Sequence, residues 1–184
     1  MPALEQQSDL LWQFAHGDLD AFEALFREFQ GQVYRWIVRI VRDPGVAEDL
    51  TIETFWRIYR AHARFDPKRS FAAWTRRIAT NVALDYLKMD HLKSSHPQES
   101  LPDGLPAVAS PNPGLQRDIR ERTARAFRQL PAKLQVTATL ALIEEEPYKE
   151  IAEVLGISVG AVKLRVFRAL RILRKKLRQM GIEP

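Results

Sequence analysis

The sequence predicts an all-α protein built from two small helical domains that a flexible linker joins. Apolar residues recur at steps of three and four over most of the chain, and no segment shows the alternation of a strand. Residues 94–114 interrupt this pattern with five prolines and two glycines. The interruption predicts an N-terminal domain over residues 1–93, a linker over 94–114 and a C-terminal domain over 115–184.

The N-terminal domain is expected to contain three helices, and the first has the most regular pattern. Its apolar residues, from Phe22 to Ile40, follow steps of three and four and define one stripe on a helix surface. Asp18 lies just before this stripe and has the short acidic side chain that favours an N-cap. Residues 43–45, Asp-Pro-Gly, then end the helix and open the next one, because proline is tolerated in a first helical turn.

The second and third helices lie on either side of a short loop. The second helix is expected to run to about Ala63, and the loop covers residues 64–69. Ser70 is the expected N-cap of the third helix. The residues expected to face inward are Ala47, Leu50, Thr54, Phe55 and Ile58 in the second helix, and Trp74, Ile78, Val82 and Tyr86 in the third.

Four helices are expected in the C-terminal domain. They cover residues 119–130, 131–145, 148–155 and 159–179, and Pro147 stops the second of them. The last two form a helix-turn-helix, since Gly156 suits the left-handed end of one helix and Ser158 suits the N-cap of the next. Ala152 is small, which lets the two helices approach closely.

The last helix has two distinct faces at 100° per residue. Its inward face consists of Val159, Val162, Val166, Ala169, Leu170 and Leu173. Its outer face consists of Ser158, Ala161, Leu164, Arg165 and Arg168, with Lys163 to one side. We expect the outer face to enter the DNA major groove, where arginine can read guanine through two hydrogen bonds, and Lys163 to meet a phosphate.

Charge is distributed unevenly along the chain. The net charge is +5, yet residues 1–93 hold 13 Lys/Arg and 13 Asp/Glu, whereas residues 115–184 hold 15 and 8. Residues 163–178 hold 8 Lys/Arg and no Asp/Glu. Such a basic helix attracts the phosphates of a nucleic acid, although a solvated helix without a partner would have the same composition.

Several classes of function lack the residues that they require. The chain has no cysteine, which excludes disulfides and thiolate metal sites. The four histidines, at positions 16, 62, 91 and 96, do not have metal-ligand spacing, and no glycine-rich phosphate loop occurs. We therefore expect no catalytic site, cofactor or metal. The first eleven residues lack a basic start followed by an apolar run, so we expect no signal peptide, and no apolar run is long enough to span a bilayer. A cytoplasmic location is therefore expected.

Five stretches together resemble the extracytoplasmic-function (ECF) group of the sigma-70 family of RNA polymerase subunits. GDLDAFEALF is similar to region 2.1, AEDLTIETFWRIYRAHARFD to region 2.2, and FAAWTRRIATNVALDYLK to regions 2.3 and 2.4. LPAKLQVTATLAL and YKEIAEVLGISVGAVKLR are similar to region 4. The resemblance implies a sigma factor that binds core polymerase through the β′ coiled coil and the β subunit. It also implies an anti-sigma factor as a further partner and a role in a stress response.

The resemblance assigns three sets of residues. Core polymerase binding is assigned to Glu48, Asp49, Glu53, Thr54 and Arg57. Recognition of the melted −10 element is assigned to Lys68, Arg69, Arg76, Arg77, Asn81, Asp85 and Lys88. Asn81 and Asp85 lie one turn apart and can hydrogen-bond base edges, whereas the lysines and arginines can meet phosphates. The outer face of the last helix, from Ser158 to Arg168, would read the −35 element as duplex DNA.

The sequence departs from the family pattern in three places. Ile52 replaces a usual glutamine in the core-binding helix, and residues 88–93, KMDHLK, weaken the usual run of arginines after region 2.4. Ala161 and Leu164 replace the usual Thr and Ser. A leucine can touch a thymine methyl group but cannot hydrogen-bond a base, so an altered −35 preference is expected.

A conventional helix-turn-helix regulator is the alternative to a sigma factor. It explains residues 115–184 equally well, but it leaves the acidic helix edge and the pair of Asn81 and Asp85 without a role. Such a regulator would bind duplex DNA without polymerase, whereas a sigma factor requires the core enzyme. An enzyme is the third hypothesis, which a measurable hydrolase or transferase rate would support.

Overall fold

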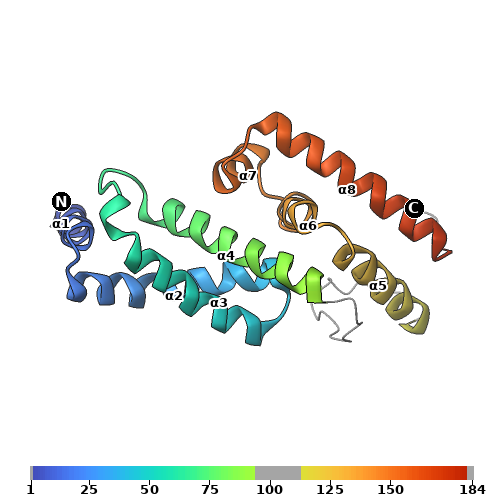
Figure 1. Cartoon of the computed structure of the whole chain (residues 1–184), viewed down its shortest axis with the longest axis horizontal. Coiled ribbons are helices and arrows are strands. Elements are labelled where there is room, and N and C mark those ends of the chain that lie inside the picture. Colours follow the sequence, from blue (N-terminus) through green and yellow to red (C-terminus); the bar gives the residue numbers. More distant parts are fainter. Residues whose placement is uncertain (1, 94–112, 182–184) are drawn as a thin grey trace. The chain divides into compact units, whose positions relative to one another are not determined.

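The computed structural model describes residues 2–93 and 113–181, and every regular element in these ranges is a helix (Figure 1). The chain forms two compact units, residues 1–83 and 84–184, and the division falls within α4 (Phe71–Lys93). The expected all-α fold with two domains is confirmed. Most of the expected linker lies outside the described residues, and its last two residues, 113 and 114, begin α5.

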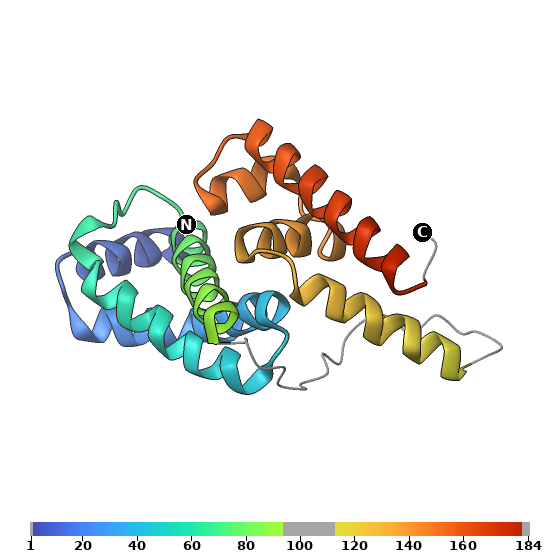
Figure 2. The same ribbon diagram turned by 45° about the vertical axis from the view of Figure 1, so that its right-hand side comes forward.

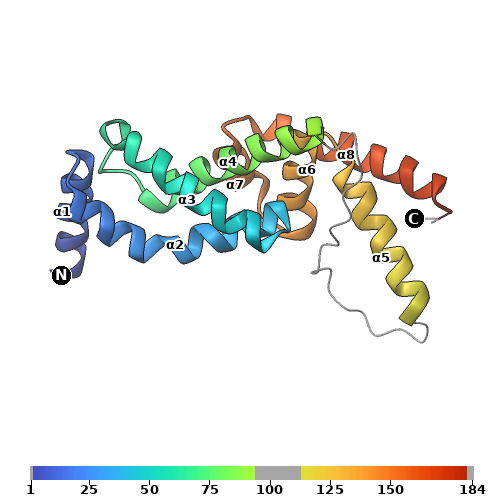
Figure 3. The same cartoon turned by 60° about the horizontal axis from the view of Figure 1, so that its bottom comes forward.

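The first unit contains a bundle of long helices. α2 (Leu19–Val41) and α3 (Pro44–Arg60) lie side by side, and α1 (Pro2–Ala15) crosses the start of α2 (Figures 1 and 3). α3 ends at residue 60 rather than 63, because a separate 3₁₀ turn follows at His62–Arg64. α1 is not expected from the sequence, since most of its apolar residues follow Asp9 and mark no stripe along its length.

The apolar stripe of α2 supplies the largest share of this unit's core. Its buried residues are Ala21, Leu25, Phe29, Val33, Trp36, Ile37 and Ile40. The Trp36 indole N–H donates a buried hydrogen bond of 2.8 Å to the Thr80 hydroxyl of α4. That hydroxyl in turn donates to the Arg76 carbonyl at 2.8 Å, which satisfies both polar groups inside the bundle.

The inward face of α4 differs from the expected one. Its buried residues are Phe71, Thr75, Ala79, Thr80, Val82, Ala83 and Leu87, whereas Trp74, Ile78 and Tyr86 are half-buried. Small residues occupy much of the buried face, and a threonine can be buried in a helix by bonding to the carbonyl one turn earlier, as Thr80 does. A prediction based on large apolar residues alone therefore places the buried face of α4 at the wrong angle around the helix axis.

Two aspartates begin the long helices of this unit. Asp18 accepts a hydrogen bond of 2.8 Å from the Ala21 N–H, and Asp43 accepts one of 3.0 Å from the Val46 N–H. The predicted N-cap at Asp18 is confirmed.

Loss of this cap should destabilise the first unit by a measurable amount. Asp18→Ala removes the acceptor and is expected to lower the free energy of unfolding by about 1 kcal/mol. Chemical denaturation of the full chain measures this change. Asp18→Asn keeps an acceptor and is the matched control. Equal stability of the alanine and asparagine variants would show that the cap contributes little.

The second unit includes four helices that follow residue 112. α5 (Pro113–Arg128) and α6 (Ala132–Ala138) pack on α8 (Val159–Gln179), and α7 (Tyr148–Leu155) lies across the start of α8 (Figure 2). The core cluster between α5, α6 and α8 consists of Ala126, Leu130, Ala138, Ala169 and Leu173.

The bounds in this unit differ from the expected ones in two places. α5 begins at residue 113 rather than 119. α6 passes into a π-helix at Thr139–Ile143, and the helix ends before Glu145, whose positive φ of 53° breaks the right-handed path. The expected bounds of α7 and α8 are confirmed.

Candidate nucleic-acid and polymerase interfaces

The turn between α7 and α8 sets the direction in which α8 projects. Gly156 ends α7 with a φ of 63°, and Ser158 begins α8 by accepting a hydrogen bond of 3.1 Å from the Ala161 N–H. Behind the turn, Ile151 and Ala152 of α7 are buried, as are Val162 and Val166 of α8. This packing holds the opposite face of α8 towards solvent, which is the arrangement of a helix-turn-helix.

The outer face of α8 presents most of the residues expected there. Lys163, Leu164 and Arg168 are exposed, and Ala161 and Arg165 are half-buried at its edge. Ser158 is exposed, and its oxygen already accepts the capping hydrogen bond, which leaves its O–H and one lone pair for a further partner. Val159 was expected to face inward and is exposed, because it lies in the first turn, before α8 meets the rest of the unit.

One residue of this face was missed by sequence reasoning. Phe167 is 63% exposed and lies one turn beyond Leu164, which is 47% exposed. Both are large apolar side chains on a helix that is otherwise basic. Helical spacing in the sequence could have placed Phe167 on this face, since a residue three positions after Leu164 lies on the same side of the helix. Exposed apolar groups within a cationic surface suit the thymine methyl groups of the major groove.

An aromatic cluster holds the loop before α4 in place. Phe65 of the loop is buried, and its ring lies 5.4 Å from Phe71 and 4.9 Å from Trp74, centre to centre. Phe14 of α1 packs on the same rings. Lys68 and Arg69 follow Phe65 and are exposed, so the cluster anchors a loop that carries two cations.

The residues expected to meet the −10 element divide between two faces of α4. Arg77 and Asn81 are exposed one turn apart, and Asp85 and Lys88 continue this face and form an ion pair of 3.1 Å. Arg76 lies on another face, where its guanidinium carbon is 4.5 Å from the centre of the Trp36 ring. The expected set is therefore not one continuous surface.

The outer face of α3 carries the expected acidic residues. Glu48 and Asp49 are exposed, and Glu53 forms an ion pair of 2.7 Å with Arg57. Thr54 requires a correction, because its side chain is fully buried and its hydroxyl donates to the Leu50 carbonyl at 2.7 Å. Thr54 is therefore part of the core and cannot contact a partner directly.

Two apolar residues lie among these charges and were not assigned to a site. Ile52 is 67% exposed and Trp56 is 56% exposed, and they lie one turn apart on the outer face of α3. Positions 48, 49, 52, 53 and 56 share this face by helical spacing. We refer to Glu48, Asp49, Ile52, Glu53 and Trp56 as the α3 face.

Three further observations concern the chemistry of the chain. Burial, helped by the neighbouring Arg125, lowers the pKa of the Arg128 guanidinium below its usual value. Within residues 2–93 and 113–181, no three His, Asp or Glu side chains are grouped so that they could hold a metal ion. No helix in the described ranges is both long and apolar enough to cross a membrane.

Comparison with known protein families identifies two segments. Residues 25–91 match the family described as sigma-70 region 2, and residues 120–173 match the one described as sigma-70, region 4. Similar proteins include the RNA polymerase sigma-H factor of Pseudomonas aeruginosa, which is 31% identical over 96% of each chain. The RNA polymerase sigma factor CarQ of Myxococcus xanthus is 33% identical, over 93% of this chain and 97% of its own.

Solved structures share the same fold. CnrH, in complex with the cytosolic domain of CnrY, is 25% identical with a TM-score of 0.56, over 94% of this chain and 97% of its own. The sigma factor RpoE of Bartonella quintana, in complex with the anti-sigma factor NepR, is 18% identical with a TM-score of 0.55. The latter match covers 87% of this chain and 98% of that one and supports the fold alone.

Proposed function

The chain belongs to the sigma-70 family, and on that premise we propose how its surfaces divide the work of an ECF sigma factor. Such a factor directs RNA polymerase to promoters, binding both the core enzyme and promoter DNA, and it is not itself an enzyme. One observation carries the proposal: regions 2 and 4 occur in one chain and in this order. A conventional regulator would account for region 4 only.

Region 4 reads the −35 element with the outer face of α8. Arg165 and Arg168 meet base edges in the major groove, and Leu164 and Phe167 contact thymine methyl groups. Lys163 and the basic residues beyond it neutralise phosphates of the same duplex. The support is the exposure of these side chains on a capped helix whose opposite face is buried.

Region 2 holds the melted −10 strand on α4 and on the loop before it. Asn81 hydrogen-bonds an unpaired base, and the cations of the loop and helix, Lys68, Arg69 and Arg77, meet phosphates. Asp85 and Lys88 pair with each other in the free protein and separate only if the strand offers better partners. Separating this ion pair costs little free energy, because an ion pair exposed to solvent contributes less than about 1 kcal/mol to stability.

Core polymerase binds the α3 face. Its acidic residues complement a basic surface and speed association, and its apolar pair supplies contact area that is buried on binding. Bound to polymerase, region 4 docks on upstream duplex while region 2 captures bases that are available only after melting. Binding energy therefore favours the open promoter over the closed one.

Run-off transcription with purified core polymerase tests this function. Addition of the full chain should give transcripts of defined length from a small subset of a promoter library, and the subset should share −10 and −35 sequences. A matched reaction without the chain should give none. Failure of core polymerase to bind the chain in a pull-down, with specific binding of the chain alone to duplex DNA, would support a conventional regulator instead.

Leu164 should make one −35 position sensitive to a methyl group. Replacing the contacted thymine by deoxyuridine removes only that methyl and should weaken holoenzyme binding about 3- to 5-fold, as expected for about 0.8 kcal/mol per buried carbon. The Leu164→Ser variant should not distinguish the two bases. Binding of −35 duplexes by fluorescence anisotropy measures both. Unchanged promoter preference in the serine variant would contradict a reading role for Leu164.

The location of the protein follows from its proposed partner, RNA polymerase. We place it in the cytoplasm, where bacterial polymerase works. CnrH was solved with the cytosolic domain of CnrY, and the RpoE of Bartonella quintana with the anti-sigma factor NepR. We propose that this chain also binds an anti-sigma factor. Purification of the endogenous protein with polymerase as its sole partner would contradict that proposal.

A further inference from the structure

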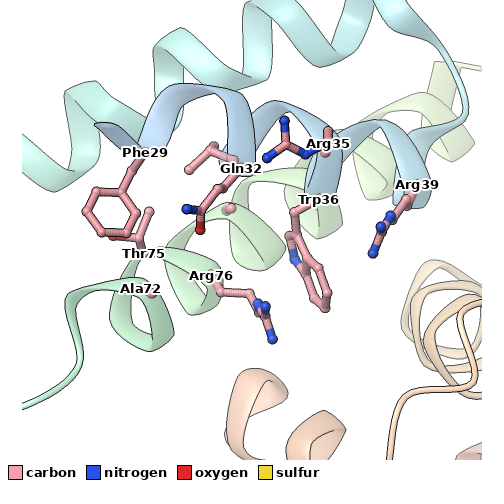
Figure 4. A pocket seen from close by; sticks show the side chains of 10 residues that line it. Phe29, Gln32, Arg35, Trp36, Arg39, Ala72, Thr75 and Arg76 are labelled. Carbon is pink, nitrogen blue, oxygen red and sulfur yellow. The ribbon is translucent and has the colours of Figure 1, made fainter. Parts of the chain in front are cut away.

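A groove between α2 and α4 lies apart from the surfaces assigned above. It has a volume of about 290 Å³, and its principal lining residues are Phe29, Gln32, Arg35, Trp36, Arg39, Thr75 and Arg76. Figure 4 shows Phe29 and Thr75 at one end and Arg39 at the other, with Arg35, Trp36 and Arg76 between them. The groove thus connects α4, which carries the −10 residues, with a helix that has no assigned role in binding.

The lining is strongly cationic. Three arginines contribute to it, two from α2 and one from α4, and none of the ten lining residues is acidic. Three positive side chains around one groove give it a positive potential, which attracts an anion. The guanidinium group presents a planar set of donors that matches a phosphate better than a point charge does.

Thr75 supplies an independent indication of a ligand. Its side chain is only 2% exposed, and within the described part of the chain its hydroxyl has no hydrogen-bond partner. Its helical neighbour Thr80 satisfies its own hydroxyl on the carbonyl one turn earlier. A buried hydroxyl without a partner is destabilising, so its position beside three arginines points to a group that accepts a hydrogen bond from it when bound.

The floor of the groove is rigid. Trp36 is buried, its N–H is held by Thr80, and Arg76 stacks on its ring. Gly31 lies one turn before Arg35, and a Cβ added to it would lie 3.4 Å from the Arg35 Nη1 atom and close to nothing else.

We propose that the α2–α4 groove binds a backbone phosphate of the melted promoter strand, held by Arg35, Arg39 and Arg76 with the Thr75 hydroxyl donating to it. This inference rests on the proposed function of region 2 and adds α2 to the path of the strand. Arg76 belongs both to the groove and to α4, so the groove borders the helix that carries Arg77 and Asn81.

The test uses holoenzyme and a fluorescent oligonucleotide that carries the nontemplate −10 strand of the best promoter from the run-off library. The double variant Arg35→Gln/Arg39→Gln should bind it about tenfold more weakly. The slope of log affinity against log salt concentration should become shallower by about 0.7, the value for one phosphate of a single strand. Arg27→Gln is the control, because Arg27 lies on α2 in an ion pair with Glu23.

Thr75→Val separates a ligand contact from a structural role. Valine has nearly the same shape and removes the unsatisfied hydroxyl, so the melting temperature should stay the same or rise while strand binding falls several-fold. An unchanged salt slope in the double arginine variant would overturn the proposal. Displacement of the strand by 1 mM adenosine monophosphate from the wild type, but not from that variant, would support the groove as the phosphate site.

The same assay distinguishes failure of this inference from failure of the proposed function. An Asn81→Ala variant should lose strand binding whether or not the groove takes part. Loss in that variant with no change in the double arginine variant would leave region 2 with its function and the groove without one. No strand binding by the wild-type holoenzyme would contradict both.

Discussion

Holoenzyme assembled with a Trp56→Ala variant is expected to form with about 30-fold lower affinity than the wild type, as for a hot spot of about 2 kcal/mol. Trp56 is 56% exposed, at the C-terminal end of the α3 face, and Ile52, one turn before it, is 67% exposed. Tryptophan is the residue most often found at the energetic centre of an interface, since its large apolar surface is removed from water on binding. The acidic residues around it contribute more to the rate of association and to partner choice than to affinity.

Titration of labelled chain with core polymerase measures this loss. Trp12→Ala is the matched control, because Trp12 is also an exposed tryptophan of the first unit but lies in α1. It should bind core polymerase like the wild type, and both variants should have wild-type melting temperatures. Equal affinities of the two variants would show that the α3 face is not the docking surface.

Ile52→Gln gives a complementary measurement. Glutamine is the usual residue of the family at this position, and a polymerase surface matched to it would bind the variant more tightly than the wild type. If the polymerase surface opposite Ile52 is apolar, the variant should instead bind several-fold more weakly. The sign of the change shows which kind of surface this sigma factor meets.

Local signals predicted the helix-turn-helix in nearly every detail. Gly156 takes the left-handed conformation that ends α7, and Ser158 makes the capping hydrogen bond that begins α8. Each of these features depends on the residue itself and on neighbours within one helical turn. Sequence alone is sufficient where the determinants are as local as this.

Features that depend on a second helix were predicted less well. Helical spacing predicted that Thr54 faces inward, but the family resemblance also assigned it to a docking surface, and it is buried with its hydroxyl bonded to the Leu50 carbonyl. Trp56 was assigned no role, and Ile52 was noted only as a departure from the family pattern. An apolar side chain does not show by itself whether another helix covers it. Helical periodicity shows which residues share a face, but it does not show which face the rest of the fold covers.

The α2–α4 groove shows the same limit more strongly. Arg35 and Arg39 are one turn apart on α2, and Arg76 is far from both in sequence. Only the relative rotation of two packed helices places the three around Trp36. Arg76 and Arg77 were both assigned to the −10 element, and they lie on different faces of α4, because neighbours on a helix differ in direction by 100°.

Replacement of Arg165 and Arg168 by alanine should have the largest effect on transcription. A good bidentate contact to guanine contributes about 1–3 kcal/mol, so loss of two should lower run-off transcription at least about 30-fold at subsaturating holoenzyme. The helix itself should remain intact, since alanine favours helix and the buried contacts of Val162 and Val166 are unchanged. Circular dichroism of the full chain checks that the fold is retained.

The decisive readout is the pattern of base preference rather than the loss itself. The Arg165→Ala/Arg168→Ala variant should bind −35 duplexes with changed bases almost as well as the best promoter, because the residues that discriminate are gone. The control variant, Arg171→Ala/Arg174→Ala, changes two arginines that lie further along α8. It should weaken binding to all sequences by a similar factor and make the salt dependence shallower, as phosphate contacts do. If the first variant instead lost affinity uniformly, these arginines would contact only the backbone. Sequence reading by region 4 would then depend on Leu164 and Phe167 alone.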